Sequence, residues 1–372
     1  GAVTTGATHA IRKPLAAFHA HSGVRNLSQN LGSRTPVHGG GALVDRMVSC
    51  EKERAAQVQS CRGLSLELSE RQACDVELIT TGAFSPIEGF MSQQEWLSVL
   101  KDMRIPGSNL LFGLPVVLDT FRTDIEPGAR VALTHKGRVL AVMDVQSRWH
   151  PDKAFECQAS YGATSLEHPG VRLIATERGP TYIGGPLHGH ALPTRVYPST
   201  TPAQLRARLP ADKDVVAFQC RNPIHRAHYE LFIRALDAPN VGPGAVVLVH
   251  PTCGPTQEDD IDGVTRFRTY EVLKAELDNP RVQWAYLPYS MHMAGPREAI
   301  QHMIMRKNFG CTHFIIGRDM AGCKSSLTGK DYYGPYDAQD MARKHCEELG
   351  IQIVPSLDLV STAEEGYVTA DE

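Results

Sequence analysis

From residue 214 onward the chain alternates between short apolar runs and segments with a helical pattern, and this alternation limits the possible folds most strongly. The predicted strands are 214–219, 245–250, 282–286, 312–317 and 351–354. The predicted helices are 225–236, 265–277, 296–307 and 337–348. Apolar strands that alternate with helices are typical of βαβ units and of a parallel sheet. The sequence therefore predicts an α/β fold with a parallel sheet for this part of the chain.

Polar or turn-forming stretches follow four of the predicted strands. They cover residues 219–222, 250–252, 288–295 and 317–322. Each lies at the carboxyl end of its strand, which is where open parallel sheets bind ligands. We therefore expect these stretches to form one shared site, although the first and last are about a hundred residues apart in the sequence.

The stretch after the first of these strands has the features of an anion site. Pro223 disfavours helical geometry at the residue before it and suits the first turn of a helix. His225 and His228 are three residues apart, so both rings project from one face of that turn. The turn also presents unpaired backbone N–H groups, and Arg221 adds a permanent charge beside it. Phosphate or sulfate fits this stretch best, although a zinc pair or an ordinary helix surface would also explain the two histidines.

The composition excludes several classes of protein. A chain of 372 residues suggests two or three domains. The net charge of -3 gives no electrostatic case for nucleic-acid or membrane partners. No run approaches the length of about eighteen apolar residues that a membrane-spanning helix needs. The nine cysteines are spaced irregularly, which indicates neither a zinc site nor a disulfide framework and suits a reducing compartment.

The chain before residue 190 has a different texture. Residues 1–44 contain no Asp or Glu but four basic side chains, a composition typical of an organelle transit segment or of a flexible arm. Residues 45–190 contain short strand-like runs that favour a small β-barrel. These runs are 114–118, 130–133 and 139–143. No acid, base or nucleophile constellation occurs there, so we expect a structural domain that packs against the ligand-binding segment, residues 191–372.

The ten residues from Gln219 to His228, Gln-Cys-Arg-Asn-Pro-Ile-His-Arg-Ala-His, closely resemble the catalytic motif of the ATP sulfurylase (sulfate adenylyltransferase) family. Segments 82–91, 168–171 and 331–339 also resemble sulfurylase sequences. The resemblance implies a Rossmann-like nucleotidyltransferase domain at 191–372, preceded by a small β-rich, PUA-like barrel domain at 45–190. It also leads us to expect a fragment that lacks the family's carboxy-terminal lid domain.

The resemblance implies roles for particular residues. The catalytic positions are Cys220, Arg221 and Asn222, and the sulfate-binding groups are Gln219, Arg221 and the backbone N–H of Ala321. The residues expected to bind ATP are Gln219, Asn222, His225, His228, Gly317, Arg318, Asp319, Met320 and Leu359. His225 and His228 would contact the phosphates and stabilise the leaving pyrophosphate. No residue is expected to hold a metal, because Mg²⁺ would arrive with the polyphosphate of ATP.

Some of these positions differ from the residues common in the family. They are Cys220 in place of Thr, Met320 in place of His, His292 in place of Arg and Gln257 in place of Lys. Cys220 lies beside Arg221 and close to a helix start, an environment that favours the thiolate. One hypothesis is that Cys220 is the most reactive of the cysteines, and the alternative is that it replaces Thr only in size.

Simpler roles are also open for the predicted ligand-binding side chains. Arg318 could form a salt bridge with Asp319 at the end of its strand. Arg221 could pair with one of the carboxylates at 258–260. Gln219 could be a turn residue only.

The implied reaction is sulfate adenylyltransfer, the first step of sulfate assimilation, in which a sulfate oxygen attacks the α-phosphorus of ATP in line. The products are adenosine 5′-phosphosulfate and pyrophosphate. Sulfate needs no general base, so we expect a site that is rich in Arg, His and backbone N–H and poor in carboxylates. The alternatives are another His-motif adenylyltransferase with an organic acceptor, and a catalytically impaired nucleotide-binding subunit.

Expectations for assembly and location are less direct. We expect a homo-oligomer, and the net charge of -3 favours neither nucleic-acid nor membrane partners. The variants Gln-Cys-Arg-Asn and Gly-Cys-Lys-Ser-Ser resemble algal members of the family. Together with the composition of residues 1–44, they favour a plastid (chloroplast) location, and a mitochondrial or cytoplasmic location is the alternative.

Overall fold

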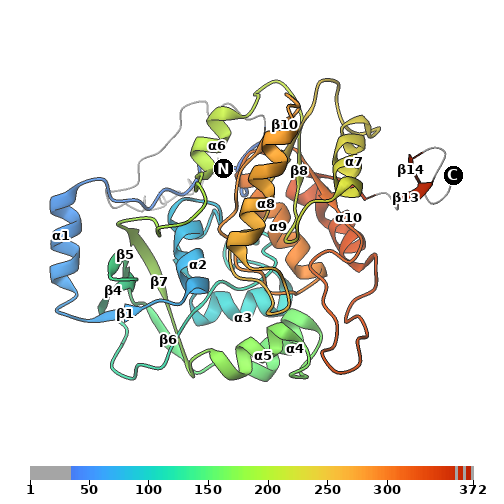
Figure 1. Ribbon diagram of the computed structural model, residues 1–372. Coiled ribbons are helices and arrows are strands. Elements are labelled where there is room, and N and C mark those ends of the chain that lie inside the picture. The colour runs from blue at the N-terminus through green and yellow to red at the C-terminus, as the bar shows by residue number, and fades with distance from the viewer. Residues whose placement is uncertain (1–34, 357–358, 363–365, 370–372) are drawn as a thin grey trace, which may run out of the picture.

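The computed structural model describes residues 35–356, 359–362 and 366–369 (Figure 1). The expectation for residues 1–44 therefore lies almost wholly outside the described residues. The helices are α1 (Glu51–Ser60), α2 (Glu70–Thr80), α3 (Gln93–Asp102), α4 (Lys153–Tyr161), α5 (Pro169–Arg172), α6 (Pro202–Arg208), α7 (Arg226–Arg234), α8 (Gly263–Glu276), α9 (Pro296–Asn308) and α10 (Asp337–Leu349). The strands are β1 (Ser65–Glu67), β2 (Gly89–Phe90), β3 (Leu118–Thr120), β4 (Arg130–His135), β5 (Arg138–Asp144), β6 (Ser147–Trp149), β7 (Thr181–Gly189), β8 (Val215–Phe218), β9 (Val246–Val249), β10 (Val282–Trp284), β11 (His313–Ile316), β12 (Gln352–Pro355), β13 (Leu359–Thr362) and β14 (Gly366–Thr369).

Five strands of the carboxy-terminal part form one sheet in the order β10-β9-β8-β11-β12. Every neighbouring pair in this sheet is parallel. Each strand and α-helix that was predicted here is present, with its ends within two residues of the expected positions. The predicted α/β fold with a parallel sheet is confirmed.

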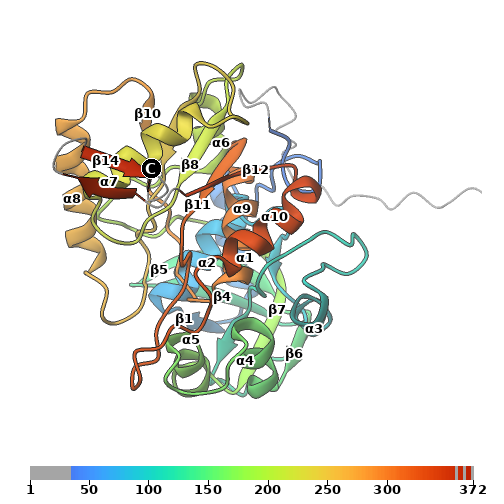
Figure 2. The same ribbon diagram turned by 90° about the vertical axis from the view of Figure 1, so that its right-hand side faces the viewer.

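The two faces of this sheet pack on different helices, because successive side chains of a strand point to opposite faces. On β8, Val215 and Ala217 belong to the core that contains residues of α9 and α10. Val216 and Phe218 belong to a second core with residues of α7 and α8. Helices α9 and α10 lie side by side on their face of the sheet (Figure 2). The sheet is therefore the middle layer of three, and its strand ends remain available for a site.

The amino-terminal part contains a second sheet, in the order β1-β4-β5-β7-β2, with β3 and β6 also paired to β7. The strands predicted at 130–133 and 139–143 are present as β4 and β5. The strand predicted at 114–118 is wrong except for its last residue, because β3 begins at Leu118. Leu114 is buried and its N–H donates to Oε1 of Gln301 on α9 (3.3 Å). The apolar run therefore marks burial in the hydrophobic cores, where Leu114 packs with residues of α4 and α5, rather than strand pairing.

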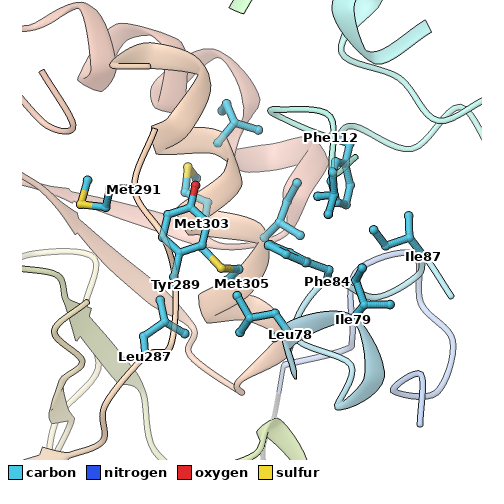
Figure 3. Packing of buried hydrophobic residues seen from close by; sticks show 14 of the residues in the cluster. Leu78, Ile79, Phe84, Ile87, Phe112, Leu287, Tyr289, Met291, Met303 and Met305 are labelled. Carbon is cyan, nitrogen blue, oxygen red and sulfur yellow. The ribbon is translucent and has the colours of Figure 1, made fainter. Parts of the chain in front are cut away.

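The two parts share one hydrophobic core (Figure 3). Leu78 of α2 and Phe84, in the turn after it, pack with Tyr289 and with Met303 of α9. The rings of Phe84 and Tyr289 meet edge to face with centroids 6.3 Å apart. The amino-terminal part thus packs directly against the elements that carry the predicted site.

Among the described residues, no helix combines the length and the apolar character that crossing a membrane requires.

Candidate functional site

The polar segments after the strands converge at one edge of the parallel sheet, as predicted. The N–H of Thr252 donates to the carbonyl of Cys220 (2.9 Å), which joins the segments after β8 and β9. The N–H of Gly295 donates to the carbonyl of Ala321 (3.0 Å), which joins the segment before α9 to the one after β11. The sheet therefore brings together segments that are far apart in the sequence.

A cavity of about 850 Å³ opens at this edge. Arg221 lines it from the end of β8, and Arg318, Asp319 and Met320 line it from the end of β11. The first residue of α9 and the loop 322–334 form much of the remaining wall. Arg221 and Arg318, which were predicted to serve one site, thus face the same cavity.

The amino-terminal part, which we expected to be structural only, contributes to this cavity. Glu167, two residues before α5, and Arg172, the last residue of α5, line the cavity. The hydroxyl of Ser325 donates to the carboxylate of Glu167, and Nη2 of Arg172 lies 3.5 Å from Oε2 of Glu258. The site therefore lies between the two parts of the chain. The only signal for this in the sequence was the resemblance of the segment 168–171 to sulfurylases.

Arg221 pairs with one of the carboxylates at 258–260, which was the simpler alternative to sulfate binding. Its Nε lies 3.0 Å from Oδ2 of Asp260. The N–H is not directed at that oxygen, so the contact is Coulombic and not a well-formed hydrogen bond. Its two terminal nitrogens have no hydrogen-bond acceptor among the described residues, and the side chain lines the cavity. A guanidinium held in this way can still offer paired donors to a tetrahedral oxyanion.

The cavity is richer in carboxylates than expected, and the expectation of few carboxylates was wrong. Nε of Arg318 lies 3.5 Å from Oδ2 of Asp319, and Nζ of Lys324 lies 3.6 Å from Oδ1 of Asp331. All four of these side chains are more than half exposed, and such pairs contribute only about 0–1 kcal/mol. An anionic ligand can therefore compete for the two cations. Within the described ranges, no group of three or more His, Cys, Asp and Glu side chains is arranged to hold a metal ion.

His225 and His228 stack on each other at the start of α7, with ring centroids 3.8 Å apart. They are not among the residues that line the cavity. Burial lowers the pKa of His228 to about 4, and the charge of His225 acts in the same direction. Nδ1 of His228 is buried without a hydrogen-bond partner. His228 is therefore neutral at physiological pH, and its contact with phosphate stays a prediction.

The remaining predicted residues differ in how close they lie to the cavity. Met320 lines the cavity. Asn222 follows Arg221 in the sequence and is exposed, but it does not line the cavity. Gly317 has open space where a Cβ would lie, which suits a close approach of a ligand to the backbone. Ala321 is buried and has a positive φ of 54°. Leu359 lies in the separate β13–β14 hairpin and does not line the cavity, so the structure gives its predicted contact with adenine no support.

The environment of Cys220 contradicts the hypothesis of a reactive thiol. Its side chain is buried, and its Sγ lies 3.8 Å from the hydroxyl of Tyr270 on α8. Burial raises the pKa of Cys220 to about 12, so the thiol is protonated at neutral pH. The neighbouring arginine and the helix start were visible in the sequence, but the helix that covers Cys220 comes from a distant segment. Cys50 is the exposed cysteine of the described residues.

Comparisons with known proteins agree with this architecture. The ATP-sulfurylase family model matches residues 198–372, and that of a PUA-like domain matches residues 35–191. A sulfate adenylyltransferase of Schizosaccharomyces pombe is 43% identical over 77% of this chain and 60% of its own length. One of Mycosarcoma maydis is 41% identical over 85% of this chain and 56% of its own length. The chain thus spans less than two thirds of the length of these relatives.

A solved structure extends the comparison to the fold. The hexameric APS kinase from Thiobacillus denitrificans superposes with a TM-score of 0.69 over 91% of this chain and 60% of that one. Its sequence identity of 22% supports a common fold only. The two relatives named above are fungal, so they do not support the resemblance to algal members. The family match, the relatives and the arrangement of the strand-end segments agree, and the chain belongs to the ATP sulfurylase family.

Proposed function

We propose that the protein is a sulfate adenylyltransferase, which transfers the adenylyl group of ATP to sulfate. The observation that carries the proposal is the cavity shared by Arg221, at the end of β8, and Arg318, at the end of β11. The sulfate adenylyltransferases of Schizosaccharomyces pombe and Mycosarcoma maydis, which are 43% and 41% identical over 77% and 85% of this chain, support the proposal. The cavity volume of about 850 Å³ lies within the range of about 300–1,000 Å³ that is typical of small-molecule sites.

The proposed reaction needs positioning and charge stabilisation more than acid–base chemistry. A sulfate oxygen forms a bond to the α-phosphorus, and the bond from that phosphorus to the oxygen bridging to the β-phosphorus breaks. Pyrophosphate leaves with the electron pair of that bond, and no proton has to be removed from sulfate. Arg221 would hold sulfate with its two terminal nitrogens, and Arg318 would leave Asp319 to contact the nucleotide. Bringing two anions together in line is the larger part of such catalysis.

Magnesium would enter as part of the substrate. Asp319 and Asp331 at the cavity pair with Arg318 and Lys324, and among the described residues no group of three or more His, Cys, Asp and Glu side chains is arranged to hold a metal ion. We therefore assign no residue of this chain to Mg²⁺. Bound to the phosphates of ATP, Mg²⁺ would neutralise part of their charge.

A sulfate-dependent exchange of labelled pyrophosphate into ATP tests the proposal. The protein should catalyse exchange with sulfate, and Arg221→Ala should lose at least about tenfold, since a hydrogen bond to a charged group contributes about 1.5–3 kcal/mol. Arg343→Ala is the matched control, because Arg343 is an exposed arginine of α10 that pairs with Asp340. Exchange driven by an organic acid instead of sulfate, or ATP binding without exchange, would favour one of the alternative functions.

Assembly and location are proposed on narrower grounds. A homo-oligomer is proposed from the family resemblance, and light scattering of the purified protein tests it. A plastid location is proposed from the composition of residues 1–44, and microscopy of a tagged full-length protein tests it. A diffuse cytoplasmic signal would contradict the second proposal.

A further inference from the structure

A fully buried arginine lies directly behind the predicted sulfate-binding side chain. Arg306 of α9 has no exposed surface. Its Nη2 donates to Oε1 of Gln219 (2.9 Å) and to the carbonyl of His250 (2.9 Å). Its Nη1 lies 2.6 Å from Nδ1 of His302, which accepts the hydrogen bond as a neutral ring because burial holds the pKa of His302 well below its usual value. The guanidinium is therefore fixed by three partners, of which one belongs to the predicted site.

Arg306 carries a charge that no carboxylate balances. None of the described Asp or Glu side chains forms an ion pair with it, and its other close neighbour is the ring of Phe314, 5.5 Å from the guanidinium carbon. Burial lowers the pKa of Arg306 to about 10, so it remains protonated at neutral pH. An unpaired buried charge is costly to a folded protein. If an anion binds one side chain away from Arg306, its attraction to the buried guanidinium would offset part of that cost.

The contacts of Gln219 fix which end of its amide is free. Oε1 accepts one hydrogen bond from Nη2 of Arg306 and a second from Oγ1 of Thr252 (2.9 Å). Nη2 of Arg306 can only donate, so the amide oxygen rather than the nitrogen must face it, and the hydroxyl of Thr252 then donates to the same oxygen. Nε2 has only the thioether of Met291 at 3.7 Å, and a thioether is a weak acceptor. Gln219 does not line the cavity, but its amide has free N–H donors and no free acceptor, which would suit a fully deprotonated oxyanion.

We propose that Arg306 is a positioning residue for anion binding, acting through Gln219. It orients the Gln219 amide so that only Nε2 is available to the ligand, and its charge makes the potential there more positive. It does not touch the ligand itself. This inference rests on the proposed function, in which Gln219 contacts sulfate.

Two substitutions test the orientation, and a third controls for loss of stability. Arg306→Lys keeps the charge but cannot hold Gln219, His250 and His302 together, and Thr252→Val removes the second donor at nearly constant shape. We expect the KM for sulfate to rise about tenfold in Arg306→Lys and about threefold in Thr252→Val, with a smaller change in the KM for ATP. Thr252→Val keeps the test open if Arg306→Lys does not fold.

The control is Arg206→Lys. Arg206 is also buried, and its Nη1 donates to the carbonyls of Lys307 (3.0 Å) and Asn308 (3.1 Å), but it contacts no predicted site residue. It should lower the melting temperature and leave both KM values unchanged. If Arg306→Lys and Thr252→Val behave in the same way as Arg206→Lys, Arg306 is structural only and the inference is wrong.

A second readout separates this inference from the proposed function. Low millimolar sulfate, compared with chloride at equal ionic strength, should raise the melting temperature of the wild-type protein and of Arg206→Lys. The rise should be lost in Arg306→Lys. If the wild type responds to sulfate but shows no pyrophosphate exchange, the proposed function fails while the variants still decide the role of Arg306. If the wild type shows neither response nor exchange, both proposals are overturned.

Discussion

Arg297 of α9 caps two helices of the amino-terminal part, and its removal should weaken the junction on which the cavity depends. Its Nη1 donates to the carbonyls of Leu100 (3.0 Å) and Ala159 (2.6 Å), and its Nε donates to the carbonyl of Gly113 (3.0 Å). Leu100 and Ala159 lie in the last turns of α3 and α4, where carbonyls have no partner within the helix. Arg297 thus ties both helix ends to α9, whose first residue, Pro296, lines the cavity.

The expected loss follows from the number and kind of these bonds. Burial lowers the pKa of Arg297 to about 10, so the side chain is charged at neutral pH and each bond is charge-assisted. Such a bond contributes about 1.5–3 kcal/mol, but neighbouring bonds are not additive and water can reach some of the freed carbonyls. We therefore expect Arg297→Ala to lower the free energy of unfolding by about 3–5 kcal/mol. Arg297→Lys keeps the charge with a single nitrogen and should lose about half as much.

Urea unfolding followed by tryptophan fluorescence measures this loss, because Trp96 lies on α3. Arg343→Ala is again the matched control, since its exposed pair should change the free energy of unfolding by less than about 0.5 kcal/mol. A value for Arg297→Ala within about 1 kcal/mol of the wild type would refute the reasoning. It would mean that water replaces the guanidinium at both helix ends.

Two further predictions follow from single buried positions. Burial lowers the pKa of His168 to about 4; because the unfolded ring titrates near 6.5, its stabilisation of about 3 kcal/mol is complete above pH 6.5 and is lost as the pH falls toward 4. The melting temperature of the wild type should fall as the pH is lowered from 6.5 toward 4, and that of His168→Asn should fall less. A wild-type melting temperature that does not change with pH would show that His168 is not held neutral in the folded protein. Gly295→Ala should lower the free energy of unfolding by about 1–3 kcal/mol, because φ is 49° and a Cβ would lie 2.6 Å from the ring of Tyr333. Since Tyr333 lines the cavity, the rate of ATP formation should fall as well. Gly107→Ala, with φ of 80° and open space around it, should affect stability only, and equal loss of activity in both variants would contradict the steric argument.

The parallel sheet could be predicted because its elements are specified locally. The segment from Val215 to His228 contains a β-branched run, a proline corner and a helical pattern, and each of these limits its own backbone. The strand predicted at 114–118 failed for the opposite reason. An apolar run shows that side chains are buried, but not which distant segments bury them. Leu114 packs with residues of α4 and α5, and its N–H donates to Gln301 of α9, 187 residues away.

The site shows the same division between local and distant causes. Arg221 and Arg318 could be placed in one cavity because parallel strands end at the same edge of a sheet. The contribution of Arg172 could not be predicted, because it depends on how the amino-terminal part docks. The burial of Cys220 depends in the same way on Tyr270 of another helix, so its local sequence suggested the wrong chemistry.

The central claim is that the ends of β8 and β11 hold one anionic ligand between them. Calorimetric titration of adenosine 5′-phosphosulfate into the wild type, Arg221→Ala and Arg318→Ala tests it most directly. Each single variant should raise the Kd by about tenfold or more, and the double variant should lose less than the two separate effects combined, because both side chains contact the same ligand. An unchanged Kd in either single variant would show that the two arginines do not share a ligand.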